Sequence, residues 1–126
     1  MKMILAIAFG GALGAVGRHL VATQVSHLFG AGFPVGTLAV NLLGSFAIGL
    51  LVEAAALVWA PPAELRAFLA VGFLGSFTTF STFSMEAVLL YDRGALVLMA
   101  AYVVLSVAAC VAGVLAGMQL VRVLAV

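Results

Sequence analysis

A run of hydroxyl and phenylalanine side chains in the middle of the sequence has the residue types needed to handle a dehydrated ion. Between positions 76 and 84, six of nine residues carry a hydroxyl, and phenylalanines stand between them. At helical spacing they form an aromatic stripe of Phe77, Phe80 and Phe83 beside a hydroxyl stripe of Thr78, Ser81 and Thr82. Such hydroxyls can replace water around an ion. The alternative is that they bond back to carbonyls one turn earlier or hold helices together.

Glycines in the same run weaken its helix. Gly72 and Gly75 precede the threonines, and glycines next to β-branched residues favour a departure from regular helix. A break frees backbone carbonyls, which are oxygen ligands for a hard cation. Within a membrane such a break is tolerated only where protein, water or an ion satisfies those groups.

Two other segments carry polar side chains at a spacing of four, which places each set on one helix face. The first set is Thr37, Asn41 and Ser45, and the second is Tyr102, Ser106 and Cys110. The Asn41 amide offers two N–H donors and one acceptor. Three polar stripes in an apolar background predict a path rich in neutral donors. Such a path suits a small anion, because aromatic edges also carry partial positive charge.

The charged residues near this path are Arg18 and Glu86. Arg18 follows a glycine-rich face and is predicted to face a vestibule, a partner or the membrane interface. Glu86 follows the hydroxyl run and could pair with Arg18, cap a polar vestibule or exchange protons. Glu53 is predicted to lie at the interface. His19, His27 and Cys110 lack zinc-site spacing, and the absence of a phosphate loop or nucleophile elbow argues against an enzyme.

The elements that position these residues are membrane-spanning helices. Of 126 residues, 67% are hydrophobic and 7% are charged, far from the composition of a soluble domain. A spanning helix needs about 20 apolar residues, so one four-helix transmembrane domain, 1–126, accounts for the chain. The helices are predicted near 3–25, 37–59, 64–91 and 95–122, all-α with a break in the third. The first apolar segment resembles a signal peptide and is interpreted as a span.

The charges give only a weak orientation signal. Four helices place both ends on one side, with Lys2, Arg66 and Arg122, while Arg18 and Arg93 fall toward the other. Three positive side chains against two is a small bias under the positive-inside rule. It favours insertion in both orientations and an antiparallel pair, with one fixed orientation as the alternative. With a net charge of +1, nucleic acid is not a predicted partner.

Three segments, 10–18, 36–46 and 72–86, resemble the signature stretches of the Fluc family of fluoride channels, and the resemblance covers essentially the whole chain. The Thr-Thr-Phe-Ser-Thr-Phe run at 78–83 is its most specific part. The resemblance implies a multi-pass protein of the cell inner membrane that passively exports cytoplasmic fluoride. It also implies an antiparallel, dual-topology homodimer with two fluoride pathways.

The resemblance further implies roles for individual residues. A sodium ion at the dimer centre would be held by the backbone carbonyls of Gly75 and Thr78. Phe80 and Phe83 would line the pathway. The other pathway residues would be Thr37, Asn41, Ser81, Thr82, Tyr102 and Ser106, with Arg18 and Glu86 at the vestibule. The sequence departs from the family pattern at Ser76, where glycine is common, at Cys110, where serine is, and at His19, where tyrosine is.

Two other functions fit the length and helix number. One is a small dual-topology, proton-coupled multidrug transporter, which would use a membrane carboxylate and an aromatic cage. It fits poorly, because Glu86 follows a hydroxyl run and the sole tryptophan, Trp59, sits at a helix end. The other is a structural subunit of a larger membrane complex, which would show no transport alone.

Overall fold

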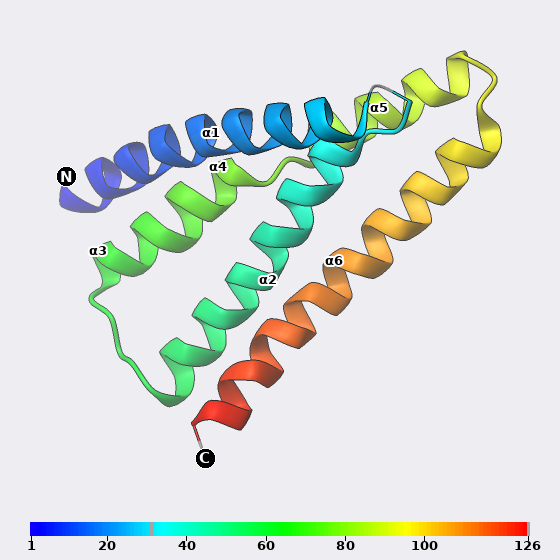
Figure 1. Cartoon of the computed structure of the whole chain (residues 1–126). Helices are drawn as coiled ribbons and strands as arrows, with labels where there is room; N and C mark the ends of the chain where they lie inside the picture. Colours follow the sequence, from blue (N-terminus) through cyan, green and yellow to red (C-terminus); the bar gives the residue numbers. More distant parts are fainter. Residues whose placement is uncertain (31, 126) are drawn as a thin grey trace.

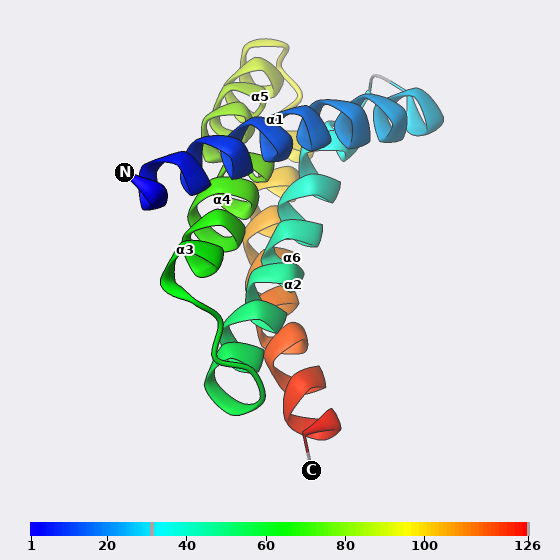
Figure 2. The same ribbon diagram turned by 90° about the vertical axis from the view of Figure 1, so that its left-hand side faces the viewer.

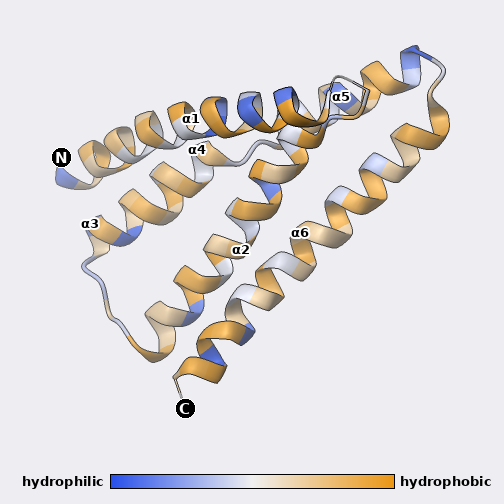
Figure 3. Cartoon of the chain, in the orientation of Figure 1, coloured by the Kyte–Doolittle hydropathy of each residue, from blue (hydrophilic) through white to orange (hydrophobic). Residues whose placement is uncertain are grey.

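The chain folds as an all-helical membrane protein. The structure is a computed structural model that describes residues 1–30 and 32–125; positions 31 and 126 of the single predicted domain lie outside the described residues. Four helical segments, Lys2–Phe29, Val35–Leu57, Ala63–Asp92 and Leu96–Leu124, are long and apolar enough to cross a membrane. Figure 3 shows apolar residues along most of each segment, with polar positions scattered between them.

The third segment is composite. The elements in chain order are α1 Lys2–Phe29, α2 Val35–Leu57, α3 Ala63–Arg66, the π-helix η1 Ala67–Leu74, α4 Gly75–Phe77, α5 Phe80–Asp92 and α6 Leu96–Leu124. Compared with the predicted ranges, the first helix continues four residues further and the second is shifted toward the N-terminus by two. The first ends at Gly30, whose φ of 82° suits glycine.

The helices associate in two close pairs, α1 with the η1–α4 segment and α2 with α6 (Figure 1). After the break, α5 leaves α4 and packs on the beginning of α6. Figure 2, turned by 90°, shows α1 crossing in front of the others while α2 and α6 run side by side. The two polar stripes of α2 and α6 therefore belong to neighbouring helices.

Both pairs are built on glycines at which the backbones touch. A Cβ at Gly10 or Gly14 of α1 would collide with the carbonyl oxygen of Phe68 or Phe73. A Cβ at Gly49 of α2 would collide in the same way with the carbonyl oxygen of Val114 on α6. Such close approach is how helices gain van der Waals contact in lipid, where no hydrophobic force drives them together.

The helical path of the third segment is interrupted at two threonines. Thr78 and Thr79 have extended conformations, with φ and ψ of −87° and 158° and of −151° and 112°. Gly72 and Gly75, which the sequence indicated as the weak points, remain helical. Gly72 instead allows α1 to approach, since a Cβ there would lie 2.7 Å from the Ile7 carbonyl oxygen.

Candidate functional site

The extended residue Thr79 is held by the side chain of Asn41 on α2. The Thr79 amide donates to Asn41 Oδ1 at 2.7 Å, and Asn41 Nδ2 donates to the Thr79 carbonyl at 3.0 Å. One side-chain amide thus satisfies both backbone groups of Thr79. The second Nδ2 hydrogen remains, and Asn41 also lines a cavity.

The Thr79 hydroxyl begins the next helix. It accepts from the Thr82 amide at 3.2 Å, as an N-cap side chain does. It also donates to Thr82 Oγ1 at 3.0 Å and lies 3.3 Å from Ser81 Oγ. These three hydroxyls therefore form one connected cluster at the start of α5. Sequence reasoning missed Thr79, although a threonine before a helical apolar pattern is a recognisable capping signal.

Two hydroxyls of the run follow the alternative raised from the sequence. Thr78 Oγ1 donates to the Leu74 carbonyl at 3.0 Å, and Ser84 Oγ donates to the Phe80 carbonyl at 2.9 Å. Each bonds one turn back along its own chain. The hydroxyl hydrogens of Thr78 and Ser84 are therefore already used in hydrogen bonds within the third segment. The hydroxyl of Ser106 on α6 differs in this respect.

The main cavity lies among α2, α6 and the broken segment. It has a volume of about 350 Å³. Its polar lining is contributed by Asn41, Ser45, Thr78, Thr79, Ser106 and Cys110, and its aromatic lining by Phe80 and Phe83. Ser106 is only 5% exposed, and its hydroxyl has no hydrogen-bond partner among the described residues. A buried hydroxyl without a protein partner is uncommon, so this hydroxyl is free to bind water or an ion that enters the cavity.

The phenylalanines separate at the break and do not form one continuous stripe. Phe77 stacks on Phe73, with ring centroids 5.9 Å apart, and lies next to Gly17 of α1. Phe80 and Phe83 lie beyond the extended residues, with their ring centroids 5.4 Å apart. Phe83 is buried, whereas Phe80 is 77% exposed. The single stripe was wrong because two extended residues change the helical register.

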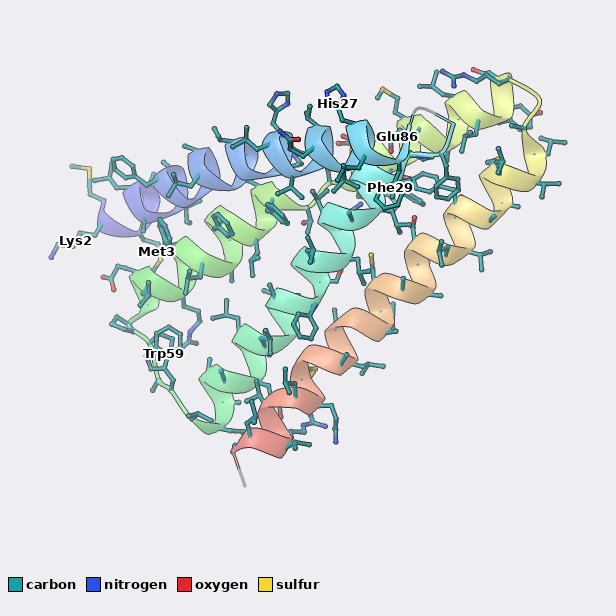
Figure 4. All side chains as sticks on the ribbon, in the orientation of Figure 1. Lys2, Met3, His27, Phe29, Trp59 and Glu86 are labelled. Carbon is teal, nitrogen blue, oxygen red and sulfur yellow. The ribbon has the colours of Figure 1, made fainter. Side chains whose placement is uncertain are left out.

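The carboxylate of Glu86 accepts two hydroxyl hydrogen bonds. Thr37 Oγ1 donates to Oε1 at 2.8 Å, and the Tyr102 hydroxyl donates to Oε2 at 2.7 Å. Figure 4 places Glu86 close to the C-terminal end of α1. Tyr102 is fully buried, and its ring centroid lies 5.2 Å from that of Phe83. The Tyr102 ring thus lies between Glu86 and Phe83, and Phe83 lines the main cavity.

The comparisons with known proteins decide the family. The profile of the family described as "CrcB-like protein, Camphor Resistance (CrcB)" matches residues 5–118. The chain belongs to this CrcB-like family. Similar relatives are the "Fluoride-specific ion channel FluC" of Rhodospirillum centenum, 52% identical over 97% of both chains, and that of Agrobacterium fabrum, 51% identical over 97% of this chain and 98% of the relative. These relatives are named as ion channels, which supports a channel over a multidrug transporter.

Arg18 and Glu86, the two residues predicted to lie at a vestibule, do not form the ion pair that was one hypothesis from the sequence. Glu86 bonds to the two hydroxyls, and the ion pair with Arg18 does not form in the single chain. Arg18 is half-buried on α1 and is not among the residues that line the main cavity. Its role at a vestibule stays a prediction.

Glu53, which was predicted to lie at the membrane interface, packs against α6 one turn before the C-terminal end of α2. It is 8% exposed, and its Oε1 lies 2.6 Å from Nε of Arg122 on α6. A second contact joins Arg122 Nη2 to Glu53 Oε2 at 3.4 Å. The sequence did not indicate this ion pair, which forms because α6 passes beside α2 at this level and supplies a counter-charge. The pair links the C-terminal ends of these two helices.

Proposed function

We propose that this CrcB-like chain forms a fluoride-selective, passive channel that exports cytoplasmic fluoride across the cell inner membrane. The main cavity supports the proposal most strongly. Its Ser106 hydroxyl is buried and unpaired among the described residues, and the remaining Asn41 N–H belongs to the same lining. Neutral donors can replace the water of a small anion without binding it so tightly that it cannot leave.

Selectivity for a small anion follows from the same lining. The cavity places hydroxyl and amide donors beside the rings of Phe80 and Phe83, whose edges carry partial positive charge. A larger, weakly hydrated anion gains less from closely spaced donors. The described lining of this cavity consists of neutral side chains, which supports a passive pathway over a proton-coupled one.

We infer that the pathway is completed by a second, antiparallel copy of the chain. Phe80 is 77% exposed, and it borders a cavity lined by Asn41, Ser45 and Thr79. Polar groups beside an open cavity do not suit contact with lipid, because hydrocarbon cannot satisfy them. A homodimer with two such pathways would cover this face.

A sodium ion at the dimer centre is part of the proposal. The residues present fit it: the turn before Thr78 has lost its regular i+4 amide donors, so carbonyls there need other partners. Gly75, at the start of this turn, is exposed in the single chain. Among the described residues there is no cluster of three His, Cys, Asp or Glu side chains. An ion here would therefore rest on backbone oxygens, with Gly75 and Thr78 as candidates.

The first test is ion efflux from liposomes that contain the purified protein, followed with fluoride and chloride electrodes. Rapid fluoride loss with chloride retained is expected. Phe80→Ile should slow fluoride loss at least about tenfold, because it removes the ring edge from the cavity. Phe9→Ile, at a 68%-exposed phenylalanine on α1, is the matched control and should behave as the wild type. Fluoride retention by folded, inserted wild-type protein would refute the proposed function.

A further inference from the structure

A second cavity is lined by Glu86, which does not line the main cavity. Its volume is about 210 Å³, and its walls come from the end of α1, the connection before α2 and the last turns of α5. Ser26, Pro34, Glu86 and Arg93 are among its lining residues. Figure 4 agrees with this placement, since Glu86 lies near His27 and Phe29 at the end of α1.

The two cavities are separated by a wall only a few side chains thick. Glu86 lines the second cavity and accepts the hydroxyl of Tyr102 at 2.7 Å. The Tyr102 ring packs on Phe83, which lines the main cavity. An ion in the second cavity is therefore next to the hydroxyls that lead to the proposed fluoride path.

The charges of the second cavity are Glu86 and Arg93. Seven residues separate them, which is nearly two helical turns, so both lie on the same face of α5. A carboxylate at this place repels an approaching anion, and a nearby cation offsets that repulsion. Arg93 takes no part in the ion pair found among the described residues, which joins Arg122 to Glu53.

Building on the proposed function, we propose that the second cavity is an anion-capture chamber at the mouth of the fluoride pathway, in which Arg93 offsets the repulsion of Glu86 and so lets fluoride enter. Arg93 ends α5 next to the Gly94 turn and is exposed, so it meets ions as they arrive from water. The positive charge of Arg93 offsets the repulsion between the Glu86 carboxylate and an entering anion, which lowers the barrier to entry. Arg93 is a positioning residue for capture, upstream of the donors in the main cavity.

A purely structural role for Arg93 has a different signature. An arginine at a helix C-terminus also stabilises the helix dipole, and its loss would then lower the amount of folded channel at every fluoride concentration. Capture acts only while entry limits the flux, and it weakens as salt screens the charge. The Debye length is about 30 Å at 0.01 M and about 3 Å at 1 M ionic strength.

The experiment measures initial fluoride flux against fluoride concentration, in about 0.01 M and about 1 M potassium gluconate. At low salt and subsaturating fluoride, Arg93→Gln should reduce flux about three- to tenfold. Flux at saturating fluoride should stay unchanged, and the defect should nearly vanish at high salt. Arg93→Lys should retain most of the wild-type rate. Arg66→Gln, at an exposed arginine of α3 outside the cavity, is the matched control and should have no effect.

Two results would overturn the capture chamber. One is wild-type flux in Arg93→Gln at low salt and low fluoride. The other is a reduction by the same factor at every fluoride and salt concentration, which would assign Arg93 a structural role. Either result with an active wild-type protein leaves the proposed channel function standing. Absence of fluoride flux in the wild-type protein would instead contradict the proposed function itself.

Discussion

Asn41 shows how one side chain makes a broken helix compatible with a membrane. Its amide pairs with both backbone groups of Thr79. Without these bonds each backbone group would cost about 1–3 kcal/mol. The same side chain also borders the main cavity, so its structural and proposed conducting roles cannot be separated by simple truncation.

At Ser106, a structural role can be separated from a conducting role. Its buried hydroxyl has no partner among the described residues, so Ser106→Ala removes no protein hydrogen bond. We expect unchanged or slightly raised stability, within about 0.5 kcal/mol, together with a several-fold loss of fluoride flux. Unfolding in mixed micelles and liposome efflux measure the two effects. Ser84→Ala, whose hydroxyl bonds to its own chain, is the control and should keep wild-type flux; equal flux in both variants would exclude Ser106 from the pathway.

At the scale of elements, the α2–α6 crossing sets the width of the main cavity. Asn41 and Ser106 stand on these two helices, and Gly49 lets their backbones touch. The π-helix η1 plays a comparable role against α1, because Gly72 meets the Ile7 carbonyl there. π-Helical turns are rare and frequently occur at functional sites.

Gly49→Ala is expected to push α2 away from α6. Its Cβ would collide with backbone atoms of Val114, which cannot move aside as a flexible side chain can. The expected cost is about 1–3 kcal/mol of stability, with reduced fluoride selectivity as the donors separate. Gly17→Ala is the matched control, since its Cβ would make an ordinary 3.6 Å contact with Phe77. Comparable unfolding of the two variants would show that the crossing tolerates a side chain.

At the scale of the whole molecule, the single chain leaves much of its side-chain surface uncovered. Its buried hydrophobic residues are few: Val40, Ala67, Phe77, Phe83, Leu90 and Tyr102. Lipid can cover the apolar part of the remainder. The open, partly polar cavity beside Phe80 needs another cover, which the proposed second copy would supply.

The proposed dimer predicts a particle with twice the 12.8 kDa mass of the chain in detergent solution. An antiparallel arrangement further predicts that Asp92→Cys, at an exposed position at the end of α5 in a Cys110→Ser background, is labelled from both sides of sealed vesicles. Light scattering and an impermeant thiol reagent measure these outcomes. A monomeric mass in flux-competent protein would contradict the dimer, and one-sided labelling would contradict the antiparallel arrangement.

The sequence was sufficient for features that depend on short-range pattern. Long apolar runs predicted the four spans. The spacing of Thr37, Asn41 and Ser45 also predicted a shared face, but not its partners. Which atoms Asn41 would bond depended on a residue 38 positions away.

Other features depended on packing that periodicity cannot express. The sequence did not indicate that Glu53 pairs with Arg122, because the two residues are 69 positions apart. The break falls at Thr78 and Thr79, not at the more flexible glycines, because Asn41 and a capping hydroxyl stabilise the extended backbone only there. The position of a helix break is thus a tertiary property.

The hydrogen bonds between Asn41 and Thr79 also have a consequence for the insertion of the chain into the membrane. The third segment leaves the ribosome with one residue, Thr79, whose backbone amide and carbonyl pair with α2 and not with its own helix, and hydrocarbon does not accept such groups. Its partner on α2 has already been synthesised by then. The third segment should therefore enter the bilayer together with the second, as a preassembled hairpin, and not as an independent span. Biogenesis of this small protein thus depends on the order in which its helices appear.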